Sequence, residues 1–211
     1  MGRGGTRRPG RVKGEMVRMS FTVWFTGLPC SGKTTLSRRL FNYLKEWGFQ
    51  AHLMDGDAIR AQLPRPLSFS KPDRDRHGRR LGSLAQELNR RGIISIVAAI
   101  TPYSETRDHN RRKIKNYIEV FCSCPVAVAE SRDSRGLYAK ARSGKITHFT
   151  GISDPYEEPE APEVVVFTDR EDIDTCLTRI LIYLEKQGLI HIRPKPAQSP
   201  EARAGDFNPA S

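Results

Sequence analysis

One short segment limits the choice of fold more than any other part of the chain. Residues 27–34 read Gly-Leu-Pro-Cys-Ser-Gly-Lys-Thr, which matches the pattern G-x-x-x-x-G-K-[ST] at every position. An apolar run at 21–25 precedes this segment, and apolar residues at helical spacing follow it. In this order of strand, glycine-rich loop and helix, backbone N–H groups and a helix N-terminus surround a pyrophosphate. The segment therefore predicts a nucleoside triphosphate site.

Each part of this loop has a chemical role in holding a triphosphate. Glycines let the backbone direct several N–H groups at phosphate oxygens. We expect Lys33 to reach the β- and γ-phosphates and Thr34 to bind Mg²⁺ through its hydroxyl. Cys30 lies inside the loop, and we interpret it as a small filler residue. The residues of the loop predicted to bind ATP are Gly27, Leu28, Pro29, Cys30, Ser31, Gly32, Lys33, Thr34 and Thr35.

Strand and helix patterns alternate along the rest of the core. Apolar, β-branched runs predict strands at residues 21–25, 49–54, 93–100, 117–122 and 164–167. Helical spacing predicts helices between them, at 36–47, at 81–88, from about Ser104, and at 173–184. Thr168 and Glu171 are predicted to form a capping box for the last helix. Such alternation indicates one α/β domain over residues 19–190, with about five parallel strands and helices on both faces, the P-loop NTPase fold.

Basic residues are concentrated in a tail ahead of this core. The chain has 35 Lys and Arg against 24 Asp and Glu, a net charge of +11. Residues 1–18 hold six Lys or Arg against one Glu, five glycines and few apolar side chains, so we predict a disordered basic tail. Residues 191–211, with four prolines, predict a second, Pro-rich disordered tail. The core stays basic, as expected for a site that binds small polyanions as well as for one that binds nucleic acid.

Two further features bear on location. No apolar run reaches the roughly 20 residues of a membrane span, and residues 1–18 lack the apolar region of a secretory signal. The four cysteines are too few and too unevenly spaced for a disulfide framework. We therefore expect a cytoplasmic protein with no membrane partner.

Acidic residues follow the second predicted strand. Asp55 and Asp57 flank Gly56 at its end, and Arg60 comes three residues later. Ligands of parallel sheets bind at this edge, where carboxylates can hold a hydrated metal ion or take a proton from a hydroxyl. We assign Asp57 to the acceptor hydroxyl and Asp55 to Mg²⁺ through water, although the two roles could be exchanged. An ordinary Asp-Gly turn is the alternative.

At this point the sequence resembles the adenylylsulfate kinases, which transfer a phosphoryl group from ATP to the 3′-hydroxyl of adenosine 5′-phosphosulfate. The resemblance runs from about Phe21 to Leu184 and consists of several motifs in a fixed order. They are the loop at 27–35, the Asp-Gly-Asp-x-x-Arg box at 55–60, residues 69–74, Arg79-Arg80, Thr-Pro-Tyr at 101–103, residues 132–142 and residues 149–157. A phosphate loop alone would indicate only a superfamily, whereas this set is specific to the family.

The resemblance implies roles for individual residues. Arg60 and Arg74 would hold the phosphosulfate group, and Phe69 and Phe149 would stack on either side of the acceptor adenine. Arg132 would pack on the ATP adenine, while Lys140 and Arg142 would belong to a lid and stabilise charge in the transition state. Thr101 stands where bacterial members carry a serine that can be phosphorylated. The acceptor-binding residues implied in this way are Asp57, Arg60, Phe69, Arg74, His77, Ile100, Thr101 and Phe149, and the catalytic ones Lys33, Asp55, Asp57, Lys140 and Arg142.

Three positions depart from the family's usual pattern, and all lie on the acceptor side. His77 replaces an asparagine, Ala99 a phenylalanine, and Thr147 a lysine. The expected activity is ATP-dependent formation of 3′-phosphoadenosine 5′-phosphosulfate, with a kinase of another nucleotide as the alternative. A nucleotide-binding regulatory or nucleic-acid-binding protein is the alternative of another class, although no nucleic-acid-binding motif is present. The resemblance also implies a homodimer and a functional link to ATP sulfurylase.

Overall fold

The computed structural model describes residues 20–191, and both predicted tails lie outside this range apart from His191. Its centre is a five-stranded sheet in the order β2-β3-β1-β4-β5, and every pair of neighbouring strands is parallel. This confirms the predicted α/β architecture. The strands are β1 (Thr22–Thr26), β2 (Ala51–Asp55), β3 (Ile94–Ala98), β4 (Tyr117–Ser123) and β5 (Val164–Phe167).

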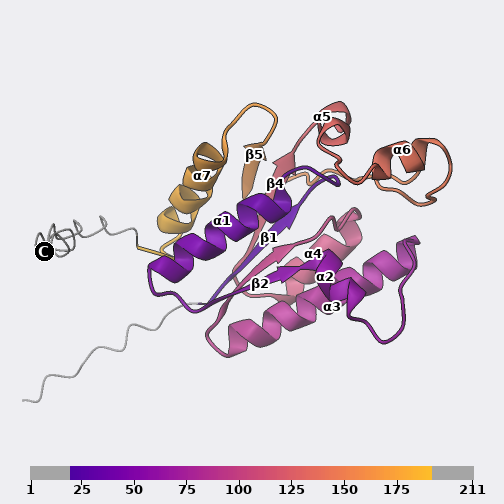
Figure 1. Ribbon diagram of the computed structural model, residues 1–211. Helices are drawn as coiled ribbons and strands as arrows, with labels where there is room; N and C mark the ends of the chain where they lie inside the picture. The colour runs from indigo at the N-terminus through magenta and orange to yellow at the C-terminus, as the bar shows by residue number, and fades with distance from the viewer. Residues whose placement is uncertain (1–19, 192–211) are drawn as a thin grey trace, which may run out of the picture.

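Helices cover both faces of the sheet (Figure 1). The helices are α1 (Lys33–Glu46), α2 (Gly56–Ala61), α3 (Lys71–Arg90), α4 (Ser104–Lys113), α5 (Val126–Ser131), α6 (Leu137–Arg142) and α7 (Ile173–Lys186). Helices α1 and α7 pack on one face, and α3 packs on the other. Helices α5 and α6 project from the body of the domain, at the upper right of Figure 1. None of the helices in the described residues is long and apolar enough to cross a membrane.

Alternation along β1 explains why one strand supports two hydrophobic layers. Val23 and Phe25 belong to the cluster formed with α1 and α7, whereas Trp24 belongs to the cluster formed with α3. All three side chains are fully buried. Successive side chains of a strand point to opposite faces, so a central strand covered on both sides is apolar at every position.

Helix α3 is longer than its apolar pattern indicates. It begins at Lys71 and has 20 residues, whereas apolar spacing predicts only 81–88. Its first half buries Arg74, His77 and Gly78 instead of large apolar residues. Gly78 faces α4 closely, because a Cβ there would lie 2.6 Å from Cγ2 of Thr106. Hydrophobic periodicity therefore cannot reveal this half of the helix.

The predicted capping box of the last helix is wrong. Helix α7 begins after Asp172, whose side chain accepts a hydrogen bond from the N–H of Thr175. Thr168 instead donates its hydroxyl to the carbonyl of Ser31 in the phosphate loop, at 3.0 Å. Glu171 accepts from the N–H of Phe167 and pairs with Arg179. Both side chains serve tertiary contacts, so the cap falls to the next acidic residue.

Helix α7 offers a direct test of which face supports the fold. We expect Ile180→Ala to lower the free energy of unfolding by about 2–5 kcal/mol, because Ile180 is fully buried against the sheet. Ile182→Ala, on the same helix but 45% exposed, should change it by no more than about 0.5 kcal/mol. Urea denaturation of both variants measures the difference. Equal losses would contradict the packing described here.

Candidate active site

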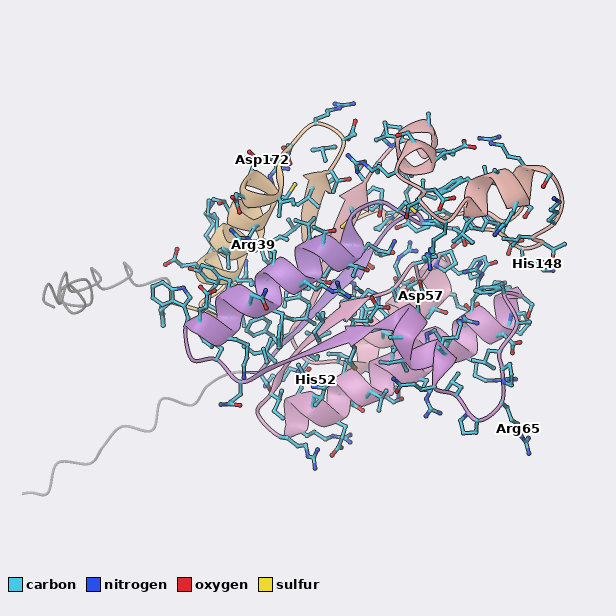
Figure 2. All side chains as sticks on the ribbon, viewed as in Figure 1. Arg39, His52, Asp57, Arg65, His148 and Asp172 are labelled. Carbon is cyan, nitrogen blue, oxygen red and sulfur yellow. The ribbon has the colours of Figure 1, made fainter. Side chains whose placement is uncertain are left out.

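A cavity of about 980 Å³ lies at the end of the sheet where the parallel strands terminate. Its wall combines the loop after β1, the end of β2, the segment after β3, the loop after α6 and the start of α7. Figure 2 labels three residues that line it: Asp57 at the start of α2, His148 after α6 and Asp172 before α7. Segments far apart in the chain therefore meet at one site.

The phosphate loop is held in shape by two glycines. Gly27 has a φ of +146°, and a Cβ there would lie 2.6 Å from the carbonyl oxygen of Cys122 on β4. Gly32 has a φ of +88° and is the N-cap residue of α1. A left-handed backbone and a close approach both favour glycine. The helix N-terminus and its free N–H groups consequently face the cavity, as anion binding requires.

Lys33 lies across the inside of this loop. Its ammonium group donates hydrogen bonds to the carbonyls of Gly27, at 3.0 Å, and Leu28, at 2.6 Å. Burial lowers the pKa of Lys33 below the ordinary lysine value, and nearby acidic groups such as Asp57 oppose the shift. The side chain lines the cavity and so is placed to meet the phosphates.

Other residues of the loop are held from outside. The hydroxyl of Tyr138 donates to the carbonyl of Pro29 at 2.9 Å, and Thr168 donates to Ser31. Cys30 has a φ of +61°, and burial raises the pKa of its thiol. A raised pKa keeps the thiol protonated, which is compatible with a filler residue and not with a nucleophile.

The two aspartates after β2 have different environments. Asp55 accepts hydrogen bonds from the N–H groups of Asp57 and Ala58, at 3.0 and 3.2 Å, and thereby caps α2. Its other oxygen lies 3.3 Å from the hydroxyl of Thr34. Asp57 is exposed and lines the cavity. The structure therefore pairs Asp55 with Thr34 and leaves Asp57 on the wall of the cavity.

The oxygens of Thr34 and Asp55 fit Mg²⁺. Hard oxygen ligands beside a phosphate loop are the usual protein contribution to such a site, with phosphates and water completing it. Within residues 20–191, no group of three or more His, Cys, Asp or Glu side chains could hold a metal ion by itself. A magnesium ion here would therefore depend on the nucleotide for part of its coordination.

Arginines and an aromatic ring form the opposite end of the cavity. The guanidinium groups of Arg60 and Arg74 lie 4.9 and 5.2 Å from the ring centre of Phe69. Arg74 also donates to the carbonyls of Phe69, at 2.8 Å, and His148, at 2.7 Å. Phe149 lines the same cavity, and it is buried with its ring edge-on to Tyr138. The two aromatic rings and both arginines implied by the resemblance are thus brought together.

A smaller cavity of about 40 Å³ adjoins this end, and His77, Ala99, Ile100 and Thr101 help to line it. Nε2 of His77 lies 2.9 Å from the carbonyl of Gly56 and must donate, because a carbonyl only accepts. Thr101 has a φ of +43°, and its hydroxyl accepts from Nε1 of Trp24 at 3.0 Å. Ile100 lines both cavities, whereas Thr101 lines only the smaller one.

Arg132 lines the large cavity, whereas the two cations predicted to belong to a lid lie outside it. Arg132 donates to the carbonyl of Thr168 at 2.7 Å. Lys140 is exposed on α6, and Arg142 forms an ion pair with Glu130 at 2.8 Å. Neither Lys140 nor Arg142 lines either cavity. The structure therefore does not bring these two cations to Lys33, Asp55 and Asp57, the other residues predicted to be catalytic.

Several residues of the cavity wall were not predicted from the sequence. Arg135, Leu137 and Thr150 lie within the motifs at 132–142 and 149–157, but the resemblance implies no role for them. The others lie outside those motifs, and they are Ile146, His148, Thr168, Glu171, Asp172, Ile173 and Cys176. From the sequence, the start of α7 is interpreted only as a helix end. Its position after the last strand of a parallel sheet was the available signal, since ligands bind at that edge.

A profile of the family described as adenylylsulphate kinase matches residues 19–167. The chain belongs to the adenylylsulphate kinase family. It is 47% identical over 175 residues to the adenylyl-sulfate kinase of Synechococcus sp. (strain JA-2-3B'a(2-13)), covering 83% of this chain and 100% of the relative. This family membership confirms the resemblance stated above.

Two other members of the adenylylsulphate kinase family are informative. The APS kinase of Mycobacterium tuberculosis, solved in complex with AMPPNP and APS, has a TM-score of 0.75 and 40% identity, and the match covers 79% of this chain and 98% of that one. A probable bifunctional SAT/APS kinase of Sorangium cellulosum is 46% identical over 170 residues, 81% of this chain and 29% of that protein.

His77 stands where other adenylylsulphate kinases usually have asparagine, and this predicts a pH effect on stability. Burial, with a contribution from Arg60, lowers the pKa of His77 below its ordinary 6.5. As the pH falls through about 6.5, the unfolded chain takes up a proton that the folded chain does not. The free energy of unfolding then falls by up to about 1.4 kcal/mol per pH unit until the lowered pKa is reached.

His77→Asn should remove this loss, because the amide can still donate to Gly56 but does not titrate. Urea denaturation of both proteins at pH 7.5 and 5.5 is the measurement. We expect the parent protein to lose more stability than the variant between the two pH values. The same loss in both would contradict the assignment.

Proposed function

We propose that this chain transfers the γ-phosphoryl group of ATP to the 3′-hydroxyl of adenosine 5′-phosphosulfate, producing ADP and 3′-phosphoadenosine 5′-phosphosulfate. One observation carries the proposal: a single cavity holds a phosphate loop at one end and the Phe69–Arg60–Arg74 cluster at the other. Asp57 interacts electrostatically with Lys33 on one side and with Arg60 and Arg74 on the other. The cavity therefore suits two anionic nucleotides with a carboxylate between them.

The donor end would bind ATP through the loop at 27–35. N–H groups at the start of α1 would contact the β-phosphate, and Lys33 would exchange its loop carbonyls for phosphate oxygens. Thr34 and Asp55 would hold Mg²⁺, Asp55 through water, and the ion would neutralise charge on the phosphates. Arg132, held by its hydrogen bond to the carbonyl of Thr168, would pack on the adenine.

The acceptor end would bind the phosphosulfate through Arg60 and Arg74. Guanidinium groups pair with such oxyanions in a bidentate manner, and both groups are already oriented by the ring and carbonyl of Phe69. The adenine would stack between Phe69 and Phe149. Phe69 is 48% exposed beside its two arginines, which leaves part of its ring available to a base.

Asp57 would act on the acceptor hydroxyl. In phosphoryl transfer a carboxylate orients the attacking hydroxyl and accepts its proton as the new P–O bond forms. The proton of the 3′-hydroxyl passes to a carboxylate oxygen of Asp57, and the bond from the γ-phosphorus to the bridging oxygen of ADP breaks. Lys33 would stabilise the charge that develops on the transferred group and on the leaving oxygen.

Transfer is proposed to be direct. The hydroxyl of Thr101 accepts a hydrogen bond from Trp24, and Thr101 does not line the large cavity. Both observations support a route without a phosphothreonine. Lys140 and Arg142 enter the proposal as residues of a lid over the phosphates. They follow Arg135 and Leu137, which do line the cavity, so a modest movement of α6 would bring them closer.

The proposal is tested by a coupled assay for ADP with Mg-ATP and a panel of acceptors. Adenosine 5′-phosphosulfate should give the highest kcat/KM among adenylate-type nucleotides. The second candidate, a kinase of another nucleotide, is favoured by His77 and Ala99, because both line the acceptor-side cavity and depart from the family pattern. A better turnover of another acceptor would establish that candidate, and no turnover of any acceptor would contradict both.

Removing the proposed base should lower kcat much more than it changes the KM values. Asp57→Asn is expected to lower kcat by about 10²–10⁴-fold, because an amide cannot accept the hydroxyl proton. The KM values should change little. The midpoint of thermal unfolding should stay the same, because Asp57 is exposed. Steady-state kinetics and a thermal melt are the measurements. Asp174→Asn, which changes a surface ion pair with Arg39, is the matched control, and an unchanged kcat in Asp57→Asn would assign the base elsewhere.

The same proposal covers location and partners. The four free cysteines support a reducing, cytoplasmic compartment, and a homodimer follows from the family resemblance. The fusion seen in the Sorangium protein supports a functional link to ATP sulfurylase, the enzyme class that supplies the acceptor. No membrane or specific nucleic acid is proposed as a partner.

A further inference from the structure

Arg107 is a buried arginine that the proposed chemistry does not use. It lies on α4, behind the acceptor end of the site, and its side chain is only 3% exposed. A buried guanidinium is costly unless its charge and its N–H groups are paired. The groups that pair with Arg107 therefore indicate its role in the structure.

Four groups meet this guanidinium, and one of them is the ring of Tyr156, whose centre lies 5.9 Å from it. Nε lies 3.3 Å from a carboxylate oxygen of Glu119 on β4, which is buried as well. Nη1 donates to the carbonyl of Thr101 at 2.9 Å, and Nη2 donates to the carbonyl of Glu157 at 2.7 Å. One arginine thus connects a central strand of the sheet with two separate loop segments.

The first of these segments follows β3 and lines the acceptor end of the cavity. Thr101 has a left-handed φ of +43°, which a β-branched residue adopts only when its surroundings hold it there. Its neighbour Ile100 lines both cavities, and the carbonyl of Ile100 accepts from the hydroxyl of Thr26 at 2.6 Å. Arg107 supplies the next anchor along this strained backbone.

The second segment leads from Phe149 to Glu157. It is joined to the first by further bonds: the N–H of Glu157 donates to the carbonyl of Pro102 at 2.9 Å, and its carboxylate accepts from Ser104 at 2.7 and 2.6 Å. Tyr103 donates to Asp154 at 3.3 Å. We call residues 100–104 and 154–157 the acceptor clasp. Arg107 ties both halves to β4 through Glu119, and Thr26 contacts both from β1, through the carbonyl of Ile100 and, at 2.9 Å, the hydroxyl of Tyr156.

We propose that Arg107 is a positioning residue for the acceptor: through Glu119 and the clasp it holds Ile100 and Phe149 at the separation that the acceptor nucleotide requires. The inference rests on the proposed function for the identity of the acceptor. The geometric part of the inference is independent of the proposed function, because the hydrogen bonds of the clasp exist whatever nucleotide binds there.

Arg111 provides a matched control. It pairs with the same Glu119, at 3.2 Å, and with Glu163, and it contacts neither Thr101 nor Glu157. Its side chain is 34% exposed against 3% for Arg107, so the two variants are compared by their KM values and not by their stability. A purely structural role would not raise the KM for one substrate alone. A positioning role would separate the two variants.

The test compares Arg107→Met with Arg111→Met at saturating concentrations of the other substrate. We expect Arg107→Met to raise the KM for the acceptor at least tenfold while the KM for ATP changes less than twofold. Arg111→Met should leave both KM values within twofold, even where its thermal midpoint falls. A parallel rise of both KM values in Arg107→Met, or the same pattern in both variants, would overturn the inference.

A second readout is independent of the acceptor's identity. Hydrogen exchange of the full chain should be faster in residues 100–104 and 154–157 of Arg107→Met than of Arg111→Met. If the parent protein fails to turn over adenosine 5′-phosphosulfate while this difference is present, the proposed function fails and the clasp stands. Equal exchange rates in the two variants would contradict the claim that Arg107 holds the clasp in place.

Arg107→Lys covers the case in which Arg107→Met does not fold. Lysine keeps a positive charge beside Glu119 but lacks the planar fork that reaches two carbonyls and a carboxylate at once. We expect its acceptor KM to rise at least threefold with an unchanged KM for ATP. An acceptor KM equal to that of the parent protein would show that the two backbone bonds do not position the acceptor.

Discussion

The parallel direction of all five strands is the constraint on which the site depends. Because the strands run the same way, the loops that follow them leave the sheet at one edge. The phosphate loop follows β1, Asp55 ends β2, Ile100 follows β3 and Thr168 follows β5. An antiparallel neighbour would place one of these groups at the far end of the domain.

This arrangement also explains the uneven use of charge. Lys33, Arg60 and Arg74 face one cavity, and each is partly or fully removed from water. Arg107 and Arg111 are arranged around Glu119 instead and serve the frame behind the site. These five cations thus fall into two groups, of which only the first lines the cavity.

The sequence predicts the strands and the phosphate loop well because both have local causes. An apolar run predicts β5 at its observed bounds, and the glycine pattern predicts a loop whose Gly27 cannot carry a Cβ. The first half of α3 is invisible to such reasoning because its buried face contains Arg74, His77 and glycines. Thr168 and Glu171 mislead because a capping pattern does not reveal their actual partners: Thr168 donates to Ser31, which is distant in the chain, and Glu171 pairs with Arg179 on α7. The cavity wall contributed by His148 and Cys176 depends on the assembled fold and has no motif.

The hydrogen bonds that hold the phosphate loop have a consequence for folding. Thr168 reaches Ser31 across 137 residues, Tyr156 reaches Thr26 across 130, and Tyr138 reaches Pro29 across 109. Contacts of such long sequence separation form slowly, because much of the chain must be ordered before they contribute. A chain whose last third has not yet docked contains the glycine-rich segment but not the supports that shape it. We therefore expect the shaped phosphate loop to be among the last features to form, after β5 has joined the edge of the sheet.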